Sequence, residues 1–376
     1  MKKIALIGST GSIGAQVLNV VRKNPEKFSV VSMSAHKNAR SFLNQITEFK
    51  PSVCALDYAS DGFSIPFKTE FFCGDGAYLN AVVADADIVV VAVVGYAGLK
   101  AVLKAIELKK DVALANKESL VVGGELVTSL AKRAGVNIYP IDSEHSAIWQ
   151  ALNFDCNKPF KRLILTASGG AFRDVPISEL NNVTASQALK HPNWNMGDKI
   201  TIDCATLVNK AFEVIEARWL YGADYSKIDA IIHRESIIHS MVEFEDNSVI
   251  AQMSYPTMEI PIALALDKNS RLKSNVPSLD FAKLSTLHFE EIDKNKFPCF
   301  DAVVLAGKKG GLYPAVVNAV NEVAVDAFLK GKIAYKDFYP LIDGALNAYT
   351  NEVDYSLSAI EYADAWARDF AKSKIN

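Results

Sequence analysis

The sequence has no long hydrophobic run, no closely spaced cysteines and no block of basic residues. Its longest apolar run, Ile88 to Leu99, is too short to cross a bilayer, so a membrane is not expected as a partner. The five cysteines are odd in number and none stands in a Cys-x-x-Cys spacing, which argues against a disulfide framework and against a zinc site. Without a Lys/Arg block, nucleic acid is not expected as the main partner.

A secretory leader is also not expected at the amino terminus. Met1-Lys2-Lys3 leads into an apolar stretch that is too short for the core of a signal peptide. Together with the pattern of cysteines, this predicts a cytoplasmic location. Half of the residues are hydrophobic (50%) and the net charge is −3, as in an ordinary soluble globular protein. The 376 residues are enough for roughly two or three domains.

Residues 1–150 alternate between strand-like and helix-like segments. The run at 87–94 is rich in β-branched residues and predicts a strand buried on both faces. Repeated βα alternation is typical of a parallel, doubly wound, Rossmann-like sheet, so we expect an α/β nucleotide-binding domain here. The expected strands are residues 3–7, 28–33, 87–94, 111–114 and 136–141.

The pattern changes at about residue 151. A strand at 163–166, a helix at 205–220 and antiparallel strands within 231–255 predict an α+β catalytic domain over residues 151–266. A polar, serine-containing stretch at 267–290 is expected to be a linker. Apolar residues at helical spacing after it predict a carboxyl-terminal α-helical domain at 291–376.

A glycine-rich turn joins the first expected strand to the first expected helix, with the sequence Gly8-Ser9-Thr10-Gly11-Ser12-Ile13-Gly14. Glycines permit a tight turn and let the backbone approach a pyrophosphate at the helix N-terminus. Because a glycine-rich turn alone is a modest signal, a plain turn is the alternative. The placement between a strand and an amphipathic helix favours a nucleotide.

The end of the second expected strand indicates which dinucleotide would bind. An NAD site uses an acidic residue there for the ribose 2′-hydroxyl. This sequence has Ser34-Ala35-His36-Lys37-Asn38-Ala39-Arg40, which contains no acid and two full cations. The segment therefore favours NADP, and a solvated basic turn is the alternative.

Two carboxylates, Asp142 and Glu144, follow the strand expected at 136–141. The carboxyl edge of such a sheet binds ligands, and paired carboxylates there need a positive charge. Asn116 to Ser119 should lie on the same edge, and Glu213 is a candidate third ligand on the helix at 205–220. Oxygen ligands favour Mg²⁺ or Mn²⁺ over zinc, with Co²⁺ as a further candidate. The alternative for Glu213 is a solvated helix face.

Two further segments indicate a phosphorylated substrate. Asn209 and Lys210 should share a helix face with Glu213, and with Ser168 they could bind a phosphate. Ser168 could instead be only a turn residue. The loop at 190–198 carries His191-Pro192-Asn193-Trp194-Asn195-Met196-Gly197 and suits a flap that closes over a ligand. The alternative is a surface loop whose tryptophan lies in the core.

Taken in order, these motifs make the chain resemble the 1-deoxy-D-xylulose 5-phosphate reductoisomerase family along nearly its whole length. The resemblance implies NADPH, a divalent metal, a homodimer and three domains. The matching segments are GSTGSIG (8–14), LANKESLV (114–121), DSEH (142–145), ASGGAFR (167–173), HPNWNMG (191–197), NKAFEVIEARWL (209–220), HRESIIHSMV (233–242) and NAVNEVAVDAFL (318–329).

The resemblance also implies roles for single residues. The implied metal ligands are Asp142, Glu144 and Glu213. The implied substrate contacts are Lys117, Ser143, Glu144, Ser168, His191, Cys204, Asn209, Lys210 and Glu213. The implied cofactor contacts are Thr10, Gly11, Ser12, Ile13, His36, Lys37, Asn38, Asn116, Glu118 and Gly197, and the implied flap residues are Trp194 and Met196. Two positions depart from the family pattern: Cys204 replaces a phosphate-binding serine, and a thiol is the weaker donor. His36 replaces a glycine.

The activity that the family implies is conversion of 1-deoxy-D-xylulose 5-phosphate to 2-C-methyl-D-erythritol 4-phosphate, a step in isoprenoid precursor synthesis. A retro-aldol/aldol rearrangement comes first, then hydride transfer from NADPH. The catalytic set is then Lys117, Asp142, Glu144 and Glu213, with Lys117 and Glu144 as candidates for moving protons. The alternatives are a metal-independent NADP-dependent dehydrogenase and a non-catalytic NADP-binding sensor.

Overall fold

The computed structural model describes residues 1–59, 63–268, 271–350 and 355–375. The chain forms two compact units. The first unit comprises residues 1–119, 127–146 and 257–276, and the second comprises residues 120–126, 147–256 and 277–376. The predicted domain boundaries at 150, 266 and 290 stay a prediction. Residues 269–270 of the predicted linker lie outside the described residues, as do residues 60–62, 351–354 and 376 of the neighbouring predicted domains.

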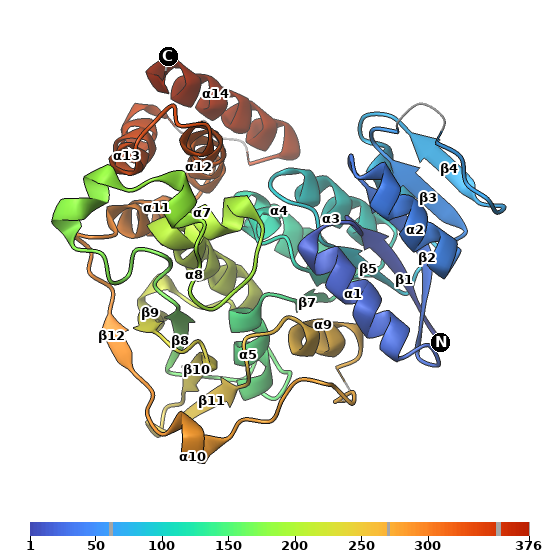
Figure 1. Cartoon of the computed structure of the whole chain (residues 1–376), viewed down its shortest axis with the longest axis horizontal. Coiled ribbons are helices and arrows are strands. Elements are labelled where there is room, and N and C mark those ends of the chain that lie inside the picture. The colour runs from blue at the N-terminus through green and yellow to red at the C-terminus, as the bar shows by residue number, and fades with distance from the viewer. Residues whose placement is uncertain (60–62, 269–270, 351–354, 376) are drawn as a thin grey trace. The chain divides into compact units, whose positions relative to one another are not determined.

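In the described part of the first unit, seven parallel strands form one sheet in the order β4-β3-β2-β1-β5-β6-β7 (Figure 1). The order reverses at β1, which has β2 on one side and β5 on the other, so the predicted doubly wound sheet is confirmed. The strands are β1 Lys2–Ile7, β2 Phe28–Ala35, β3 Val53–Leu56, β4 Glu70–Cys73, β5 Ile88–Val91, β6 Asp111–Leu114 and β7 Ile138–Pro140.

The helices of the first unit pack their apolar stripes onto this sheet. Val17, Val20 and Val21 of α1 are buried, as their spacing predicts, and so are Phe42 and Ile46 of α2. Helix α4 contributes residues to both units. The elements are α1 Ser12–Lys23, α2 Ala39–Phe49, the 3₁₀ turn η1 Ala77–Ala81, α3 Ala97–Glu107, α4 Glu118–Ala134 and α9 Glu259–Leu266.

Two expected strands are shorter than predicted: β7 covers Ile138–Pro140 of the expected 136–141, and β5 covers only half of its expected range. The apolar run predicts a strand over 87–94, but β5 ends at Val91, and Val94 is 69% exposed. The backbone turns after Ala92, whose carbonyl lies against Gly8, and reverses through Gly95 at φ +70°. The apolar run is therefore longer than the strand, because the strand ends where the turn before α3 begins.

In the described part of the second unit, five strands form a mixed sheet in the order β11-β10-β8-β9-β12. Only β8 and β9 are parallel, and the other neighbours are antiparallel, as predicted for an α+β fold. In the turn between β10 and β11, Asn247 adopts a left-handed conformation at φ +64°. The strands are β8 Arg162–Ala167, β9 Ile228–His233, β10 Ile238–Glu243, β11 Val249–Met253 and β12 Phe289–Glu291.

The single helix predicted at 205–220 is wrong, because two helices meet there. Helix α7 ends at Thr206 and α8 begins at Val208, since Leu207 adopts a left-handed conformation at φ +58° that an α-helix cannot continue. The other elements that precede the carboxyl-terminal helices are α5 Ser143–Ala151, η2 Ile177–Asn182, α6 Ala185–Ala188, α7 Asp198–Thr206, α8 Val208–Tyr221, η3 Tyr225–Lys227 and α10 Phe281–Leu284.

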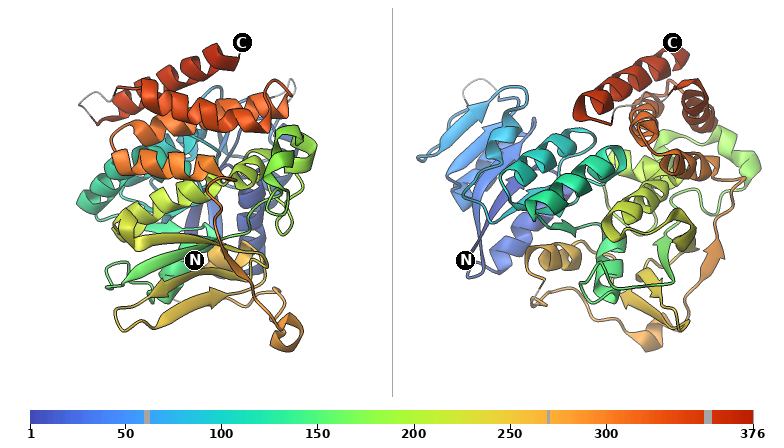
Figure 2. Two further views of the ribbon diagram at one scale, coloured as in Figure 1. Left: turned by 90° about the vertical axis from the view of Figure 1, so that its left-hand side faces the viewer. Right: turned by 180° about the vertical axis from the view of Figure 1, so that it is seen from behind.

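The carboxyl-terminal part of the second unit is helical, as predicted. Helix α12 lies beside α13 and α14 and buries Val316, Val320 and Ala324 (Figures 1 and 2). None of the helices in the described ranges is both long and apolar enough to span a membrane. The elements are α11 Pro298–Lys309, α12 Tyr313–Leu329, η4 Tyr335–Asp337, α13 Phe338–Ala348 and α14 Leu357–Ile375.

Candidate active site

The glycine-rich turn between β1 and α1 is closed too tightly for side chains at two positions. Gly8 has φ +93°, and a Cβ there would lie 2.7 Å from the Ala92 carbonyl oxygen. A Cβ on Gly14 would lie 2.2 Å from the Gly8 carbonyl oxygen. Gly11 is the N-cap of α1 and brings no side chain to the helix N-terminus. The turn therefore brings bare backbone and a helix N-terminus to the switch point of the sheet, which suits a pyrophosphate.

The basic segment after β2 lies beside this turn. The amides of Gly8 and Ser9 donate to the Ser34 carbonyl oxygen at 3.1 and 2.8 Å, which ties the turn to the end of β2. Two residues further on, the His36 ring lies 3.0 Å from Asp57 and the Lys37 ammonium lies 5.3 Å from the centre of the Tyr58 ring.

Sequence reasoning missed Asp57, which follows β3 and is 8% exposed. The segment after β2 contains no acidic residue, but Asp57 brings a carboxylate to that segment from the end of β3. The Asp57 Oδ1 accepts the Tyr78 amide at 3.1 Å and Oδ2 faces His36, so protein groups engage both oxygens. Asn38, another predicted cofactor contact, caps α2 by accepting the Ser41 amide at 3.1 Å. Only the known parallel register of β2 and β3 could have indicated Asp57.

The segment after β6 is held by a buried asparagine. Asn116 donates to the Gly95 carbonyl oxygen and to Glu118 Oε2, both at 3.0 Å, and its Oδ1 accepts the Ser119 amide at 3.1 Å. A Cβ on Gly98 would lie 2.0 Å from Asn116 Oδ1, so α3 packs closely over this residue. These hydrogen bonds of Asn116 orient the residues around Lys117.

Lys117 and Asp142 meet at the carboxyl ends of the neighbouring strands β6 and β7. The Lys117 ammonium lies 2.5 Å from Asp142 Oδ2, and the two side chains are only 7% and 15% exposed. Asp142 Oδ1 accepts the Ser143 amide at 2.9 Å, and the Ser143 hydroxyl donates to Glu144 Oε2 at 2.5 Å. The predicted juxtaposition of these segments is confirmed. The positive charge that the carboxylates require comes in part from a lysine.

A second carboxylate with a lysine partner lies on α8 of the second unit. Asn209 Nδ2 donates to Glu213 Oε1 at 2.5 Å, and the Lys210 ammonium pairs with Glu213 Oε2. The Glu213 side chain is 1% exposed and that of Lys210 is 4% exposed. The predicted shared helix face is confirmed, and Glu213 is a buried, paired carboxylate and not a solvated one. Burial of this kind is typical of functional sites and also of structural ion pairs.

Ser168 and His191 form a hydrogen-bonded pair beyond the end of β8. His191 Nδ1 accepts the amides of Asn193 and Trp194 at 3.2 and 3.0 Å, so the ring proton lies on Nε2 and donates to Ser168 Oγ at 2.9 Å. Burial, helped by the nearby Arg173, lowers the pKa of His191 from 6.5 to about 4. His191 is therefore neutral near pH 7, and this tautomer leaves the Ser168 hydroxyl proton to another acceptor.

The remaining predicted residues of the second unit lie close to this pair in the chain or in space. The Trp194 ring lies 6.1 Å from His239, and Gly197 is the N-cap of α7. Cys204 on α7 is 8% exposed, and its backbone is so near Gly170 that a Cβ there would lie 2.4 Å from the Cys204 carbonyl oxygen. The structure therefore places the cysteine next to the Ser-Gly-Gly turn.

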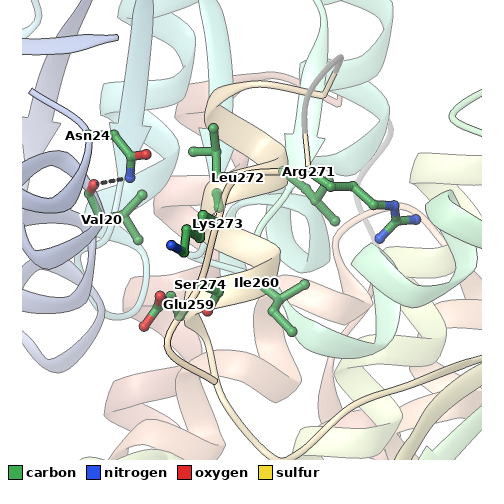
Figure 3. A pocket seen from close by; sticks show the side chains of 10 residues that line it. Val20, Asn24, Glu259, Ile260, Arg271, Leu272, Lys273 and Ser274 are labelled. Atoms are coloured by element: carbon green, nitrogen blue, oxygen red, sulfur yellow. Dashed lines mark hydrogen bonds between the residues drawn. The ribbon is translucent and has the colours of Figure 1, made fainter. Parts of the chain in front are cut away.

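The first unit contains a cavity of about 170 Å³ (Figure 3). It is bounded by α9, by the segment after it and by the carboxyl-terminal end of α1, where Asn24 donates to the Val20 carbonyl oxygen at 2.8 Å. The glycine-rich turn is at the opposite end of α1. None of the residues predicted to contact the cofactor lines this cavity, so it is separate from the predicted nucleotide site.

The glycine turn at the switch point of a parallel, doubly wound sheet is typical of dinucleotide-binding proteins of the α/β class. Family models match three segments of the chain. A model described as 1-deoxy-D-xylulose 5-phosphate reductoisomerase matches residues 4–124. Models of the carboxyl-terminal domains of the same enzyme match residues 138–221 and 253–370.

Full-length relatives carry the same description. The reductoisomerase of Chlorobaculum tepidum is 48% identical over 100% of both chains, and reductoisomerase 1 of Bacillus thuringiensis is 47% identical over 99% of this chain and 98% of its own. The chain therefore belongs to the 1-deoxy-D-xylulose 5-phosphate reductoisomerase family.

Solved structures of this enzyme have the same fold. The Zymomonas mobilis enzyme in complex with NADPH is 36% identical, with a TM-score of 0.91 over 100% of this chain and 99% of its own. A second structure, in complex with NADPH, fosmidomycin and magnesium, is also 36% identical, with a TM-score of 0.93 over 100% of this chain and 98% of its own.

Proposed function

We propose that this chain converts 1-deoxy-D-xylulose 5-phosphate to 2-C-methyl-D-erythritol 4-phosphate with NADPH and a divalent metal, within isoprenoid precursor synthesis. The observation that carries the proposal is the match to this family over the whole chain, with two carboxylate–lysine pairs of low exposure at the predicted positions. Solved relatives that contain NADPH and magnesium support both cofactors.

The NADPH site that we propose uses the turn of the first unit. The close approach of Gly8 and Gly14 leaves the backbone amides of Thr10, Ser12 and Ile13 for the pyrophosphate, whereas the Gly11 amide donates to the Gly8 carbonyl oxygen at 3.3 Å. Lys37 supplies a cation for the 2′-phosphate. The other proposed contacts are His36, Asn38, Asn116, Glu118 and Gly197.

The proposed metal ligands are Asp142 and Glu144 of the first unit and Glu213 of the second. Their oxygen donors fit Mg²⁺ or Mn²⁺, with Co²⁺ as a further candidate. Because the ligands belong to different units, their joint binding of one ion is part of the proposal. When bound, the metal supplies positive charge against the negative charge that develops on substrate oxygens during rearrangement.

The proposed role of Lys117 is proton transfer and charge stabilisation beside Asp142. Its side chain is 7% exposed, and in a poorly solvated position a fixed positive charge is more effective than in water. Glu144 is held by the Ser143 hydroxyl and is the second proposed proton carrier. Ser143 would then order the carboxylate as well as contact the substrate.

The substrate phosphate is proposed to lie against residues of the second unit. The neutral His191 donates to Ser168 Oγ and so directs the Ser168 hydroxyl proton toward a phosphate oxygen. Asn209 and Lys210 supply an amide and an ammonium, and the Cys204 thiol replaces the family's hydroxyl. The flap with Trp194 and Met196 is proposed to close over the substrate and exclude water.

A homodimer in the cytoplasm is the proposed state of the enzyme. Strand β11 is an edge strand, and its apolar residues Val249 and Ile250 are 49% and 46% exposed, an arrangement that favours pairing with a second copy. None of the five cysteines, all within the described ranges, forms a disulfide, which suits a reducing compartment.

One assay tests the proposed function. NADPH oxidation is followed at saturating 1-deoxy-D-xylulose 5-phosphate, first with Mg²⁺ and then after removal of the metal with a chelator. We expect turnover only with both the substrate and the metal. Full activity in chelator would favour a simple dehydrogenase, and tight NADPH binding without oxidation would favour a sensor.

A further inference from the structure

A third segment, the connection between β9 and β10, lies beside both the flap and the turn that begins at Ser168. β9 runs parallel to β8 and β10 runs antiparallel to it on the other side, so residues 234–237 must cross over the carboxyl end of β8. Ser168 directly follows β8 and therefore lies at that same end. The Arg173 guanidinium joins the two segments by donating to the carbonyl oxygens of Ser168 at 2.7 Å and Arg234 at 3.4 Å.

This crossing connection, residues 234–237, is held in a fixed conformation. Ser236 adopts a left-handed conformation at φ +52°, which non-glycine residues rarely occupy. The His233 ring is fully buried, and its Nε2 accepts the amides of Ile237 and Ile238 at 3.3 and 3.1 Å. Glu235 is held by the His288 ring at 2.6 Å. The carbonyl groups of this connection therefore form a rigid surface.

Asn193 of the flap donates to this surface. Its Nδ2 lies 3.1 Å from the Arg234 carbonyl oxygen and 3.3 Å from the Glu235 carbonyl oxygen. Because both partners are acceptors, the amide nitrogen must face them, and the orientation of the side chain is determined. The backbone amide of the same residue donates to His191 Nδ1, so Asn193 joins the connection to the His191–Ser168 pair.

We propose that Asn193 is a positioning residue that seats the flap on the β9–β10 connection. Its two side-chain hydrogen bonds hold residues 191–194 in the conformation in which His191 meets Ser168 and Trp194 lies near His239. Asn193 acts through the flap and touches no reacting atom. The kinetic consequence rests on the proposed function, whereas the ordering of the flap does not.

The test compares two isosteric variants on the same loop. Asn193→Asp turns the donor into an oxygen that faces two carbonyl oxygens, which is repulsive. Asn195→Asp makes the same charge change at an exposed position two residues away and is the matched control. Hydrogen exchange of residues 191–197, without substrate, is expected to be at least roughly tenfold faster in Asn193→Asp and unchanged in Asn195→Asp, because about two hydrogen bonds are lost.

Steady-state kinetics provide the second measurement. A substrate that draws the flap closed should restore turnover at saturation, so we expect the KM for the sugar phosphate to rise roughly tenfold while kcat changes less than about twofold. Asn193→Ala, which removes the donors without adding charge, should show a smaller change in the same direction. NADPH binding and thermal unfolding verify that each variant is folded.

Three outcomes overturn the proposal. One is flap exchange in Asn193→Asp that matches the wild type. Another is an equal effect in both Asp variants, which would assign the change to charge. The third is a fall in kcat at unchanged KM, which would place Asn193 in the chemistry itself. If no variant and no wild-type sample turns over the substrate, the proposed function fails, and the exchange measurement still decides the role of Asn193.

Discussion

The two units bring their predicted site residues together in different ways. In the first unit, Lys117 and Asp142 follow the neighbouring parallel strands β6 and β7, and strand order alone makes them meet. In the second unit, Ser168 meets His191 from a loop 23 residues away, and that loop rests on a connection between two other strands. A parallel sheet gathers strand ends along one edge. A mixed sheet has no such common edge, so loops must be held individually.

We expect the largest effect from the carboxylates. Asp142→Asn and Glu213→Gln should each lower kcat/KM by at least about a hundredfold and raise the Mg²⁺ concentration needed for half-maximal activity, since an amide binds a hard cation more weakly. The measurement is NADPH oxidation across a Mg²⁺ titration. The exposed Glu179→Gln is the control in the second unit. Unchanged turnover across the titration would remove both carboxylates from the metal site.

A glycine substitution tests how tightly the first unit is built. Gly14→Ala places a Cβ 2.2 Å from the Gly8 carbonyl oxygen, so we expect the free energy of unfolding to fall by about 1–3 kcal/mol and NADPH to bind more weakly. Urea unfolding and fluorescence titration measure the two effects. Gly11→Ala meets its nearest atom at 3.5 Å and should leave stability nearly unchanged. Equal stabilities of the two variants would contradict the close-approach argument.

The departure at Cys204 offers a smaller test in the second unit. Cys204→Ser replaces a weak thiol donor with a hydroxyl, so we expect the KM for the sugar phosphate to fall by about two- to fivefold. Cys156→Ser, in the same unit, should not change it. A KM that stays constant in Cys204→Ser would show that residue 204 does not contact the phosphate.

We expect the smallest effect from the titration of His191. Its pKa is lowered by burial to about 4, so between pH 6.5 and about 4 the unfolded chain binds more protons than the folded one. The contribution of His191 to stability is complete above pH 6.5 and is lost as the pH falls toward 4. In His191→Gln the decline of the melting temperature over this window should be less steep than in the wild type. An equal decline would remove His191 as a cause.

Much of the first unit could be predicted because its signals are local. The glycine turn, the β-branched run and the spacing of Val17, Val20 and Val21 each report on a few neighbouring residues. Strand ends then follow from the rule for parallel sheets. The errors in prediction arose where the backbone conformation of one residue decides, as at Leu207, which divides one expected helix into two. The extent of β5 was overestimated because hydrophobicity does not reveal where a turn begins.

The sequence by itself determined the class of sheet, the edge of the sheet at which the candidate ligand-binding residues lie, and the family, because short-range patterns and ordered motifs encode them. Only the tertiary structure decided which charges meet. It paired Lys117 with Asp142, brought Asp57 to His36 and placed the Asn193 amide on the carbonyl groups of residues 234 and 235. These contacts depend on distances between segments remote in the chain, which follow from packing and register and not from any local pattern.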